Sequence, residues 1–353
     1  MFSLNEYTYN LPSELIAQQP VMHRDRSKLM VLDRRSGIFS HLVFRDIDHL
    51  LTRDDVLVIN NSAVIPGRLY GRKDTGGKVE VLVADFAGGC KKDSEADNFI
   101  CECLIKAAKR PKPGTCFYFD QGVKAEVIES RNGTHTLKFY PGDDFEDTLY
   151  RIGEVPLPPY IKRNKKATPC DDRTAYQTVY ASEKGAIAAP TAGLHFTKAL
   201  LDKLVAKGVD IVPITLYVGY GSFSPVRVSD IRRHKMPSER FFISQASADT
   251  INTARAAGKR IVAVGTTCVR TLEYASNANG ELAPGSGSCD LFIYPGYRFR
   301  VVDAMITNFH LPKSTLLMLV SAFAGREKIL SAYMEAIKRK YRFYSYGDAM
   351  FIA

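Results

Sequence analysis

The spacing of apolar residues changes twice along this chain. Between residue 66 and about residue 150, apolar and polar residues alternate in short runs separated by turn residues, a pattern typical of half-buried strands. The runs cover residues 78–83, 99–105, 116–119, 123–128 and 134–139. Asn132-Gly133, between the last two runs, indicates a tight hairpin. Regularly spaced short strands predict a small antiparallel barrel or sandwich.

On both sides of this segment, apolar runs alternate with helical patterns. Strands are predicted over residues 56–59, 211–218 and 261–264, and helices over 197–207, over 247–257 and from Thr266 onward. Such alternation favours parallel strands. We therefore predict the fold class α/β, with a larger, barrel-like α/β domain of residues 1–65 and 152–353. A small antiparallel β-barrel domain, residues 66–151, is inserted into it.

Composition places this 353-residue chain among ordinary globular proteins, since 45% of its residues are hydrophobic and 24% are charged. No apolar run reaches the roughly 18 residues that a membrane helix needs. The first residues lack the basic-then-apolar order of a signal peptide. We therefore expect a cytoplasmic protein with no membrane partner, and a monomer.

The seven cysteines are scattered along the chain, at positions 90, 101, 103, 116, 170, 268 and 289. An odd, scattered set in a chain of this size predicts free thiols in a reducing compartment. No pair has the spacing of a zinc site. We therefore expect no bound metal.

The formal net charge is +10, and several basic clusters have tyrosines nearby. The clusters contain Arg24/Arg26/Lys28, Lys106/Lys109/Arg110/Lys112, Lys162/Arg163/Lys165/Lys166, Arg232/Arg233/Lys235 and Lys338/Arg339/Lys340/Arg342. Positive surfaces attract polyanions, and aromatic rings can stack on unpaired bases. Because many basic enzymes never bind nucleic acid, charge alone leaves RNA binding open.

The densest group of reactive side chains is the segment 307–318, which contains Asn308, His310, Lys313 and Ser314 just before an apolar run. Its proline favours an extended chain before a helix that Ser314 or the following threonine can cap. Free N–H groups at a helix start favour anionic ligand groups. A functional site is predicted here; the alternative is an ordinary cap with His310 in the core and Lys313 solvated.

A second candidate is the segment 263–273, where a predicted strand runs through a glycine into the helix that begins at Thr266. Thr266, Thr267 and the backbone N–H groups then lie at the carboxyl end of the strand, where open α/β sheets bind ligands. Arg270, one turn later, can bind a carboxylate or phosphate. The alternative is a threonine-capped helix with an Arg–Glu surface pair.

A third candidate is the segment 188–197, with Thr191, Gly193 and His195. Its small residues let backbone approach a ligand closely, and a histidine there can transfer protons near neutral pH. His195 can equally be a loop hydrogen-bonding residue. Glu239, which follows a basic loop, can act as a general base or orient a ligand, or it can be a surface carboxylate.

Several motifs together resemble the S-adenosylmethionine:tRNA ribosyltransferase-isomerases of queuosine biosynthesis. The matching segments are 9–18 (YNLPSELIAQ), 156–161 (PLPPYI), 176–181 (YQTVYA), 188–197 (AAPTAGLHFT), 263–273 (AVGTTCVRTLE), 307–320 (TNFHLPKSTLLMLV) and 346–350 (YGDAM). They occur in the family's order and span essentially the whole chain. The last segment adds Tyr346 and Asp348 to the candidate substrate-binding residues.

This resemblance implies transfer of the ribosyl part of S-adenosylmethionine onto 7-aminomethyl-7-deazaguanine at the tRNA wobble position. Epoxyqueuosine-tRNA is formed, and adenine and methionine leave. S-adenosylmethionine is then a consumed cosubstrate, with no separate cofactor, and the tRNA anticodon stem-loop is the partner. In the reaction that the resemblance implies, a base removes a proton from C5′, and His195 and Glu239 are the candidates for this base. His310 is the candidate for the group that donates a proton to the departing adenine. Lys313, or Thr266 and Thr267 with Arg270, would hold the methionine carboxylate.

Four positions depart from the family's usual pattern. Asn61 and Ala63 replace an acid and an arginine, and Tyr217 and Pro237 each replace a histidine. Because of these departures, two other functional classes of protein stay possible. One is a non-catalytic RNA-binding protein on the same scaffold; the other is a methyltransferase, although the glycine-rich loop expected of that class is not evident.

Overall fold

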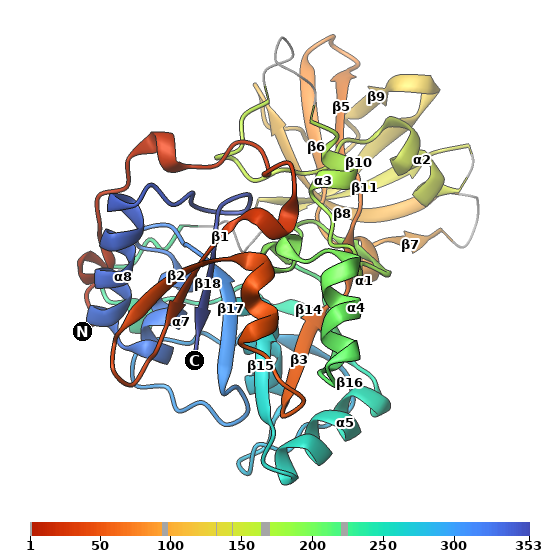
Figure 1. Cartoon of the computed structure of the whole chain (residues 1–353). Helices are drawn as coiled ribbons and strands as arrows, with labels where there is room; N and C mark the ends of the chain where they lie inside the picture. The colour runs from red at the N-terminus through yellow and green to blue at the C-terminus, as the bar shows by residue number, and fades with distance from the viewer. Residues whose placement is uncertain (1, 94–97, 132, 143, 164–169, 220–224) are drawn as a thin grey trace.

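The computed structural model describes residues 2–93, 98–131, 133–142, 144–163, 170–219 and 225–353 (Figure 1). The larger part of the chain builds a nine-stranded mixed sheet. Its order is β16 (Gly285–Cys289), β14 (Glu239–Ile243), β13 (Asp210–Leu216), β3 (Asp55–Asn60), β15 (Arg260–Val264), β17 (Ala304–Asn308), β18 (Ala349–Ile352), β1 (Lys28–Leu32) and β2 (Phe39–Val43). At the centre of this sheet, β13, β3, β15 and β17 run parallel to one another, so their carboxyl ends lie at the same end of the sheet.

Alternation along the central strands explains why both faces of this sheet are covered. Val56 and Val58 of β3 pack in one hydrophobic core, whereas Leu57 and Ile59 pack in another. The first core includes residues of α5 (Gln245–Ala256), α6 (Thr266–Ala275), α7 (Thr315–Ala324) and α8 (Arg326–Lys338); the second includes residues of α4 (Lys198–Ala206). Successive side chains of a strand point to opposite faces, so a continuous apolar run such as β3 suits a sheet buried on both sides.

A closed antiparallel barrel forms the second unit of structure. Its strands are β5 (Arg68–Lys73), β6 (Lys78–Val83), β8 (Phe99–Ala107), β9 (Cys116–Phe119), β10 (Lys124–Arg131) and β11 (Thr134–Tyr140). Pairing of β11 with β8 closes the ring. The short strand β7 (Lys91–Lys92) pairs antiparallel with the first residues of β8. The barrel has its own apolar interior, which includes Val81, Phe117, Leu137 and Phe139.

Short elements connect the barrel to the large sheet. The strand β4 (Ser62–Val64) pairs with β12 (Glu183–Ala186). The helices α2 (Phe145–Ile152) and α3 (Asp172–Ala175) follow the last barrel strand, whereas α1 (Phe86–Gly89) lies between β6 and β7. Arg68 and Glu154 exchange two backbone hydrogen bonds where the chain enters and leaves the barrel. A Cβ on Gly153 would lie 1.9 Å from the Pro66 carbonyl oxygen, so this close approach requires glycine.

The predicted α/β class with an inserted antiparallel barrel is confirmed. The described residues of the larger domain form a mixed sheet with β16 and β2 at its two edges, so this domain is not barrel-like as predicted. The segments predicted as strands or helices all carry those elements, although most boundaries differ by one to three residues. Asn132 of the predicted hairpin lies outside the described residues, but β10 and β11 are joined there as expected. The exact domain boundaries at 65/66 and 151/152 stay a prediction.

One prediction about the cysteines is wrong. Cys90 and Cys101 form a disulfide, with their Cα atoms 4.2 Å apart, instead of two free thiols. The reason is the pairing of β7 with β8, which sets Lys91 opposite Ile100 and so brings the neighbouring cysteines together. Cys103, Cys116, Cys170, Cys268 and Cys289 are free.

No helix in the described part of the chain has the length and apolar character needed to cross a bilayer.

Candidate active site

The candidate site is a cavity of about 330 Å³ at the carboxyl ends of β15 and β17. Eight of the predicted site residues line it: Thr191, Thr266, Thr267, Arg270, Asn308, His310, Lys313 and Ser314. They come from the three motif segments predicted above, which are separated in sequence by up to about a hundred residues. The remaining lining residues are mostly apolar and aromatic, a combination typical of small-molecule sites.

The start of helix α6 supplies polar groups to this cavity. Gly265 precedes the helix with a φ of 91°, a conformation that favours glycine. Thr266 and Thr267 follow it and line the cavity. The Thr267 hydroxyl oxygen is buried and makes no hydrogen bond to any of the described residues. A helix start with free N–H groups and a spare hydroxyl is suited to an anionic ligand group.

Asn308, the last residue of β17, is the centre of a neutral hydrogen-bond network. Its side-chain oxygen accepts a hydrogen bond from the Thr191 hydroxyl at 3.2 Å. Its amide nitrogen donates to the Tyr344 carbonyl and to the Nε2 atom of His195, both at 3.2 Å. Because the Tyr344 carbonyl can only accept, the side-chain atom of Asn308 that contacts it is the amide nitrogen, and Nε2 of His195 is therefore an acceptor.

His195 lies behind Asn308 and is not among the residues lining the cavity. Its Nδ1 atom lies 2.7 Å from the Ser27 hydroxyl, and its ring stacks on Phe44 with the ring centres 4.9 Å apart. Burial lowers the pKa of His195 to about 3, and the nearby Arg342 and Arg24 cations act in the same direction. His195 is therefore neutral near pH 7, with both ring nitrogens hydrogen-bonded.

His310 is also buried but does line the cavity. Its Nε2 atom lies 2.8 Å from the Thr307 hydroxyl, whereas its Nδ1 atom makes no hydrogen bond to the described residues. Burial lowers the pKa of His310 to about 3. The Tyr333 hydroxyl accepts from the His310 backbone N–H at 3.1 Å, and the His310 carbonyl accepts from the Tyr9 hydroxyl. The backbone of His310 is thus held from two sides.

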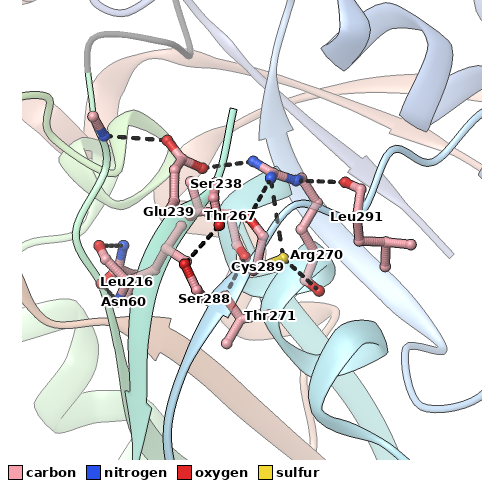
Figure 2. Close-up of polar contacts among 11 residues, drawn as sticks. Asn60, Leu216, Ser238, Glu239, Thr267, Arg270, Thr271, Ser288, Cys289 and Leu291 are labelled. Carbon is pink, nitrogen blue, oxygen red and sulfur yellow. Dashed lines mark hydrogen bonds and ion pairs between the residues drawn. The ribbon is translucent and has the colours of Figure 1, made fainter. Parts of the chain in front are cut away.

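Glu239 and Arg270 form a buried ion pair (Figure 2). The Nη1 atom of Arg270 lies 2.6 Å from a Glu239 oxygen, and both side chains are less than 5% exposed. The other Glu239 oxygen accepts from the Gly219 backbone N–H at 3.1 Å. The rest of the guanidinium donates to the carbonyls of Leu291 and Cys289, at 3.0 and 3.2 Å. This pair holds β14, α6 and the segment after β16 together.

Lys313 and Ser314 occupy the turn before α7. Ser314 is the N-cap of this helix, because its hydroxyl accepts from the Leu317 N–H at 3.1 Å. Lys313 has a φ of 59°, an unusual value for a residue with a side chain. Its ammonium group donates to the Asn5 side chain at 3.0 Å, and its backbone N–H donates to the Tyr7 carbonyl. The predicted cap is confirmed.

Three further predicted residues lie outside the cavity lining. A Cβ on Gly193 would lie 1.9 Å from the Tyr180 hydroxyl, so this glycine is required for packing. Asp348 accepts from the backbone N–H groups of Lys28 and Arg342, both at 2.8 Å, and burial raises its pKa. Tyr346 donates to Asp172 at 3.2 Å.

An aromatic wall of the cavity was not predicted from the sequence. Tyr160 and Tyr344 pack with their ring centres 4.6 Å apart, and the Tyr160 hydroxyl lies 2.7 Å from that of Ser345. Tyr176 also lines the cavity. The tyrosines near basic clusters were the only available signal, because 184 residues separate Tyr160 from Tyr344 and only the tertiary fold brings them together.

The four departing positions are not among the residues that line the cavity. Three of them lie next to β12. Ala63 pairs with Lys184, and the Asn61 carbonyl accepts hydrogen bonds from the backbone N–H groups of Ser182 and Glu183. The Tyr217 ring lies against Gly185. Pro237 is exposed. In the described ranges, no group of three or more His, Cys, Asp or Glu side chains is placed to hold a metal ion.

Comparison with known proteins extends the resemblance to the whole chain. A family profile described as "Queuosine biosynthesis protein" matches residues 4–352. The S-adenosylmethionine:tRNA ribosyltransferase-isomerases of Geotalea uraniireducens and Geobacter sulfurreducens are 52% and 50% identical to it over 350 residues, which is 99% of each chain. The solved structure of the S-adenosylmethionine tRNA ribosyltransferase from Thermotoga maritima is 38% identical. It aligns with a TM-score of 0.56 over 99% of this chain and 100% of that one.

The resemblance predicted from the seven motifs is therefore confirmed, and this chain belongs to the queuosine biosynthesis protein family.

Proposed function

We propose that this protein transfers the ribosyl moiety of S-adenosylmethionine onto 7-aminomethyl-7-deazaguanine at the wobble position of tRNA. The product is epoxyqueuosine-tRNA, and adenine and methionine are released. The observation that carries this proposal is the agreement of several relatives, about 50% identical over nearly their whole length, on one enzyme name. The protein acts as a monomer in the cytoplasm, with S-adenosylmethionine as a consumed cosubstrate and no further cofactor.

The cavity offers complementary surfaces for the parts of S-adenosylmethionine. The Tyr160–Tyr344 wall is suited to stack on the adenine ring. The start of α6, with the spare Thr267 hydroxyl, is suited to the methionine carboxylate. Lys313 adds a positive charge at the same cavity. Arg270 is already bonded to Glu239 and two carbonyls, so it supports the wall of the cavity and is not the principal carboxylate ligand.

Among the three candidates for proton transfer, His310 is placed best. It lines the cavity, and its Nδ1 atom is not used by a described residue. A neutral histidine in the tautomer that carries the proton on Nδ1 can donate a hydrogen bond from this N–H to a nitrogen of departing adenine and so stabilise the charge that develops there. His195 and Glu239 are positioning residues in this scheme, because their polar atoms already bind Ser27, Asn308, Gly219 and Arg270.

The direct test uses S-adenosylmethionine labelled in the ribose, together with tRNA that carries the aminomethyl-deazaguanine base. We expect label in the tRNA and one free adenine for each ribosyl group transferred. Tight tRNA binding with no adenine release would instead identify a non-catalytic RNA-binding protein. Transfer of a methyl label to tRNA would identify a methyltransferase.

The role of His310 is tested by His310→Gln in the same assay. We expect turnover to fall by about 100-fold or more, the usual range for loss of a hydrogen-bond donor to developing charge, while S-adenosylmethionine still binds. Tyr180→Phe is a suitable control, because Tyr180 is outside the cavity lining and keeps its ring. Near-normal turnover of His310→Gln would remove His310 from the mechanism.

A further inference from the structure

The outer face of the barrel carries a row of basic and aromatic residues that the candidate active site does not use. The strand register places Tyr140, Lys124, Tyr118, Arg72 and Lys78 directly opposite one another on β11, β10, β9, β5 and β6. We call these five residues the barrel row. Residues that are paired in register point to the same side of a sheet.

The burial pattern shows that the barrel row faces outward. Interior positions alternate with it on each strand: Ala125 on β10, Phe117 and Phe119 on β9 and Phe139 on β11 are buried. Tyr118 is 49% exposed, and Arg72 and Lys78 are exposed. The row therefore presents aromatic rings and cations together on the outer face of the barrel.

The charges on the barrel are distributed unevenly. Residues 66–151 contain 14 Lys and Arg and 14 Asp and Glu, so this segment has no net charge of its own. The barrel row nevertheless has three cations and no acid. Two residues along β10 and β11 from the barrel row, Lys138 lies opposite Glu126 and also forms an ion pair with Asp93 at 2.6 Å. The positive charge of Lys138 is therefore balanced by acids. The barrel row is thus basic, although the segment as a whole carries no net charge.

A second line of outward residues leads from the barrel row toward the larger sheet. Arg68, Tyr70 and Arg72 alternate along β5, which begins at the junction between the two units (Figure 1). Tyr70 is 48% exposed. Arg68 donates to the Leu157 carbonyl at 3.0 Å, three residues before Tyr160 of the active-site wall. Four residues of strand place Arg72 about 13 Å from Arg68.

Arg68 and Tyr70 of this line also border a cavity of about 410 Å³. Arg163 and Asp172 are among its other lining residues. Asp172 accepts a hydrogen bond from Tyr346, whose ring meets that of Tyr176 edge to face, with the centres 5.8 Å apart. Tyr176 lines the active-site cavity. Contacts between side chains thus join the lining of this cavity to the lining of the active-site cavity.

We propose that the barrel row and the outward face of β5 form an RNA-binding surface that holds the tRNA substrate beside the active site. This inference rests on the proposed function for the identity of the RNA. Arg72, Lys78 and Lys124 would contact phosphates, and Tyr118 and Tyr70 would stack on unpaired bases of the loop. A basic and aromatic outer face is a common way for small barrels to bind single-stranded nucleic acid.

The test measures binding of full-length protein to tRNA carrying the aminomethyl-deazaguanine base, over a range of salt concentrations. In Arg72→Gln/Lys124→Gln, we expect weaker binding and a flatter slope of log affinity against log salt. The slope should decrease by about one for each phosphate that the variant no longer neutralises. In Tyr118→Ala, we expect affinity to fall by at least about fivefold, the lower end for loss of one base stack. Affinity for S-adenosylmethionine should stay at the wild-type value in each variant.

The matched control is Lys91→Gln, an exposed lysine on β7 of the same barrel. Its tRNA affinity and salt slope should equal those of the wild type. Wild-type affinity and slope in Arg72→Gln/Lys124→Gln would overturn the inference, even if the wild-type enzyme transfers ribosyl groups. If wild-type protein transfers no ribosyl label, the proposed function fails separately, and the tRNA affinities still decide whether this face binds RNA.

Discussion

The His195–Asn308 network and the Glu239–Arg270 pair each contribute one residue, Asn308 and Arg270, to the lining of the same cavity, and both are buried. The first is neutral and held by directional hydrogen bonds, whereas the second joins two full charges. The sequence suggested proton transfer for both His195 and Glu239. The structure instead surrounds each with protein partners, so a reactive residue type within a motif identifies the site more reliably than it identifies the role.

The two regions should respond differently to the loss of one member. A buried ion held by an opposite charge becomes very unfavourable when that charge is removed. A neutral network loses one hydrogen bond at a time and can relax around the change. We therefore expect a large, all-or-none effect at the ion pair and graded effects in the network.

The largest effect is expected from Arg270→Met, which removes the guanidinium that neutralises the buried Glu239 carboxylate. Loss of one partner of a buried ion pair typically costs about 3–5 kcal/mol of folding free energy. Denaturation by urea measures this cost. The exposed pair Arg232–Asp230 gives the control, since Arg232→Met should cost less than about 1 kcal/mol.

The double variant Glu239→Gln/Arg270→Met separates charge from packing. It removes both charges, and we expect it to be more stable than Arg270→Met alone, because no buried ion is left without its counter-charge. If the double variant were the less stable of the two, the pair would act mainly through the hydrogen bonds to Leu291 and Cys289.

Asn308→Ala comes next, because it removes the centre of the neutral network. The His195 ring and the Tyr344 carbonyl lose their donor, and unsatisfied buried groups cost about 1–3 kcal/mol. We also expect turnover to fall by about tenfold to 100-fold as the cavity wall shifts. Urea denaturation and the ribosyl-transfer assay measure the two effects. Unchanged stability and turnover would show that His195 is held without Asn308.

The pH dependence of stability tests whether both histidines are neutral. The pKa values of His195 and His310 are lowered from 6.5 to about 3 by burial. Below pH 6.5 these histidines bind protons in the unfolded chain but not in the folded chain. The free energy of unfolding therefore falls as the pH is lowered from 6.5 toward 3. Each histidine contributes about 1.4 kcal/mol per pH unit in that window.

Urea denaturation at several pH values measures this slope, and His195→Gln should remove the contribution of one histidine. The same shifts predict that the pH profile of turnover has no inflection near 6.5 from either residue. A slope unchanged by His195→Gln would mean that His195 binds protons equally in the folded and unfolded chain, so that burial does not lower its pKa.

Local patterns predicted the α/β fold, the inserted barrel and the three site segments, because each rests on spacing over a few residues. The start of α6 and the Ser314 cap were predictable for the same reason. The pairing of Arg270 with Glu239 was not, since 31 residues separate them and β14 and α6 must pack first. The Tyr160–Tyr344 wall and the Cys90–Cys101 disulfide depend likewise on tertiary or strand pairing.

The smallest effect is expected from Thr191→Val, which deletes one hydroxyl of nearly the same shape. The Asn308 side-chain oxygen loses its bond from Thr191, while the bonds to His195 and Tyr344 remain. We expect a loss of about 0.5–1.5 kcal/mol in urea denaturation, well below that of Asn308→Ala. Thr191→Ser keeps the hydroxyl and should restore most of the difference. If Thr191→Val instead cost as much as Asn308→Ala, the neutral network would behave as a single unit, like the Glu239–Arg270 ion pair.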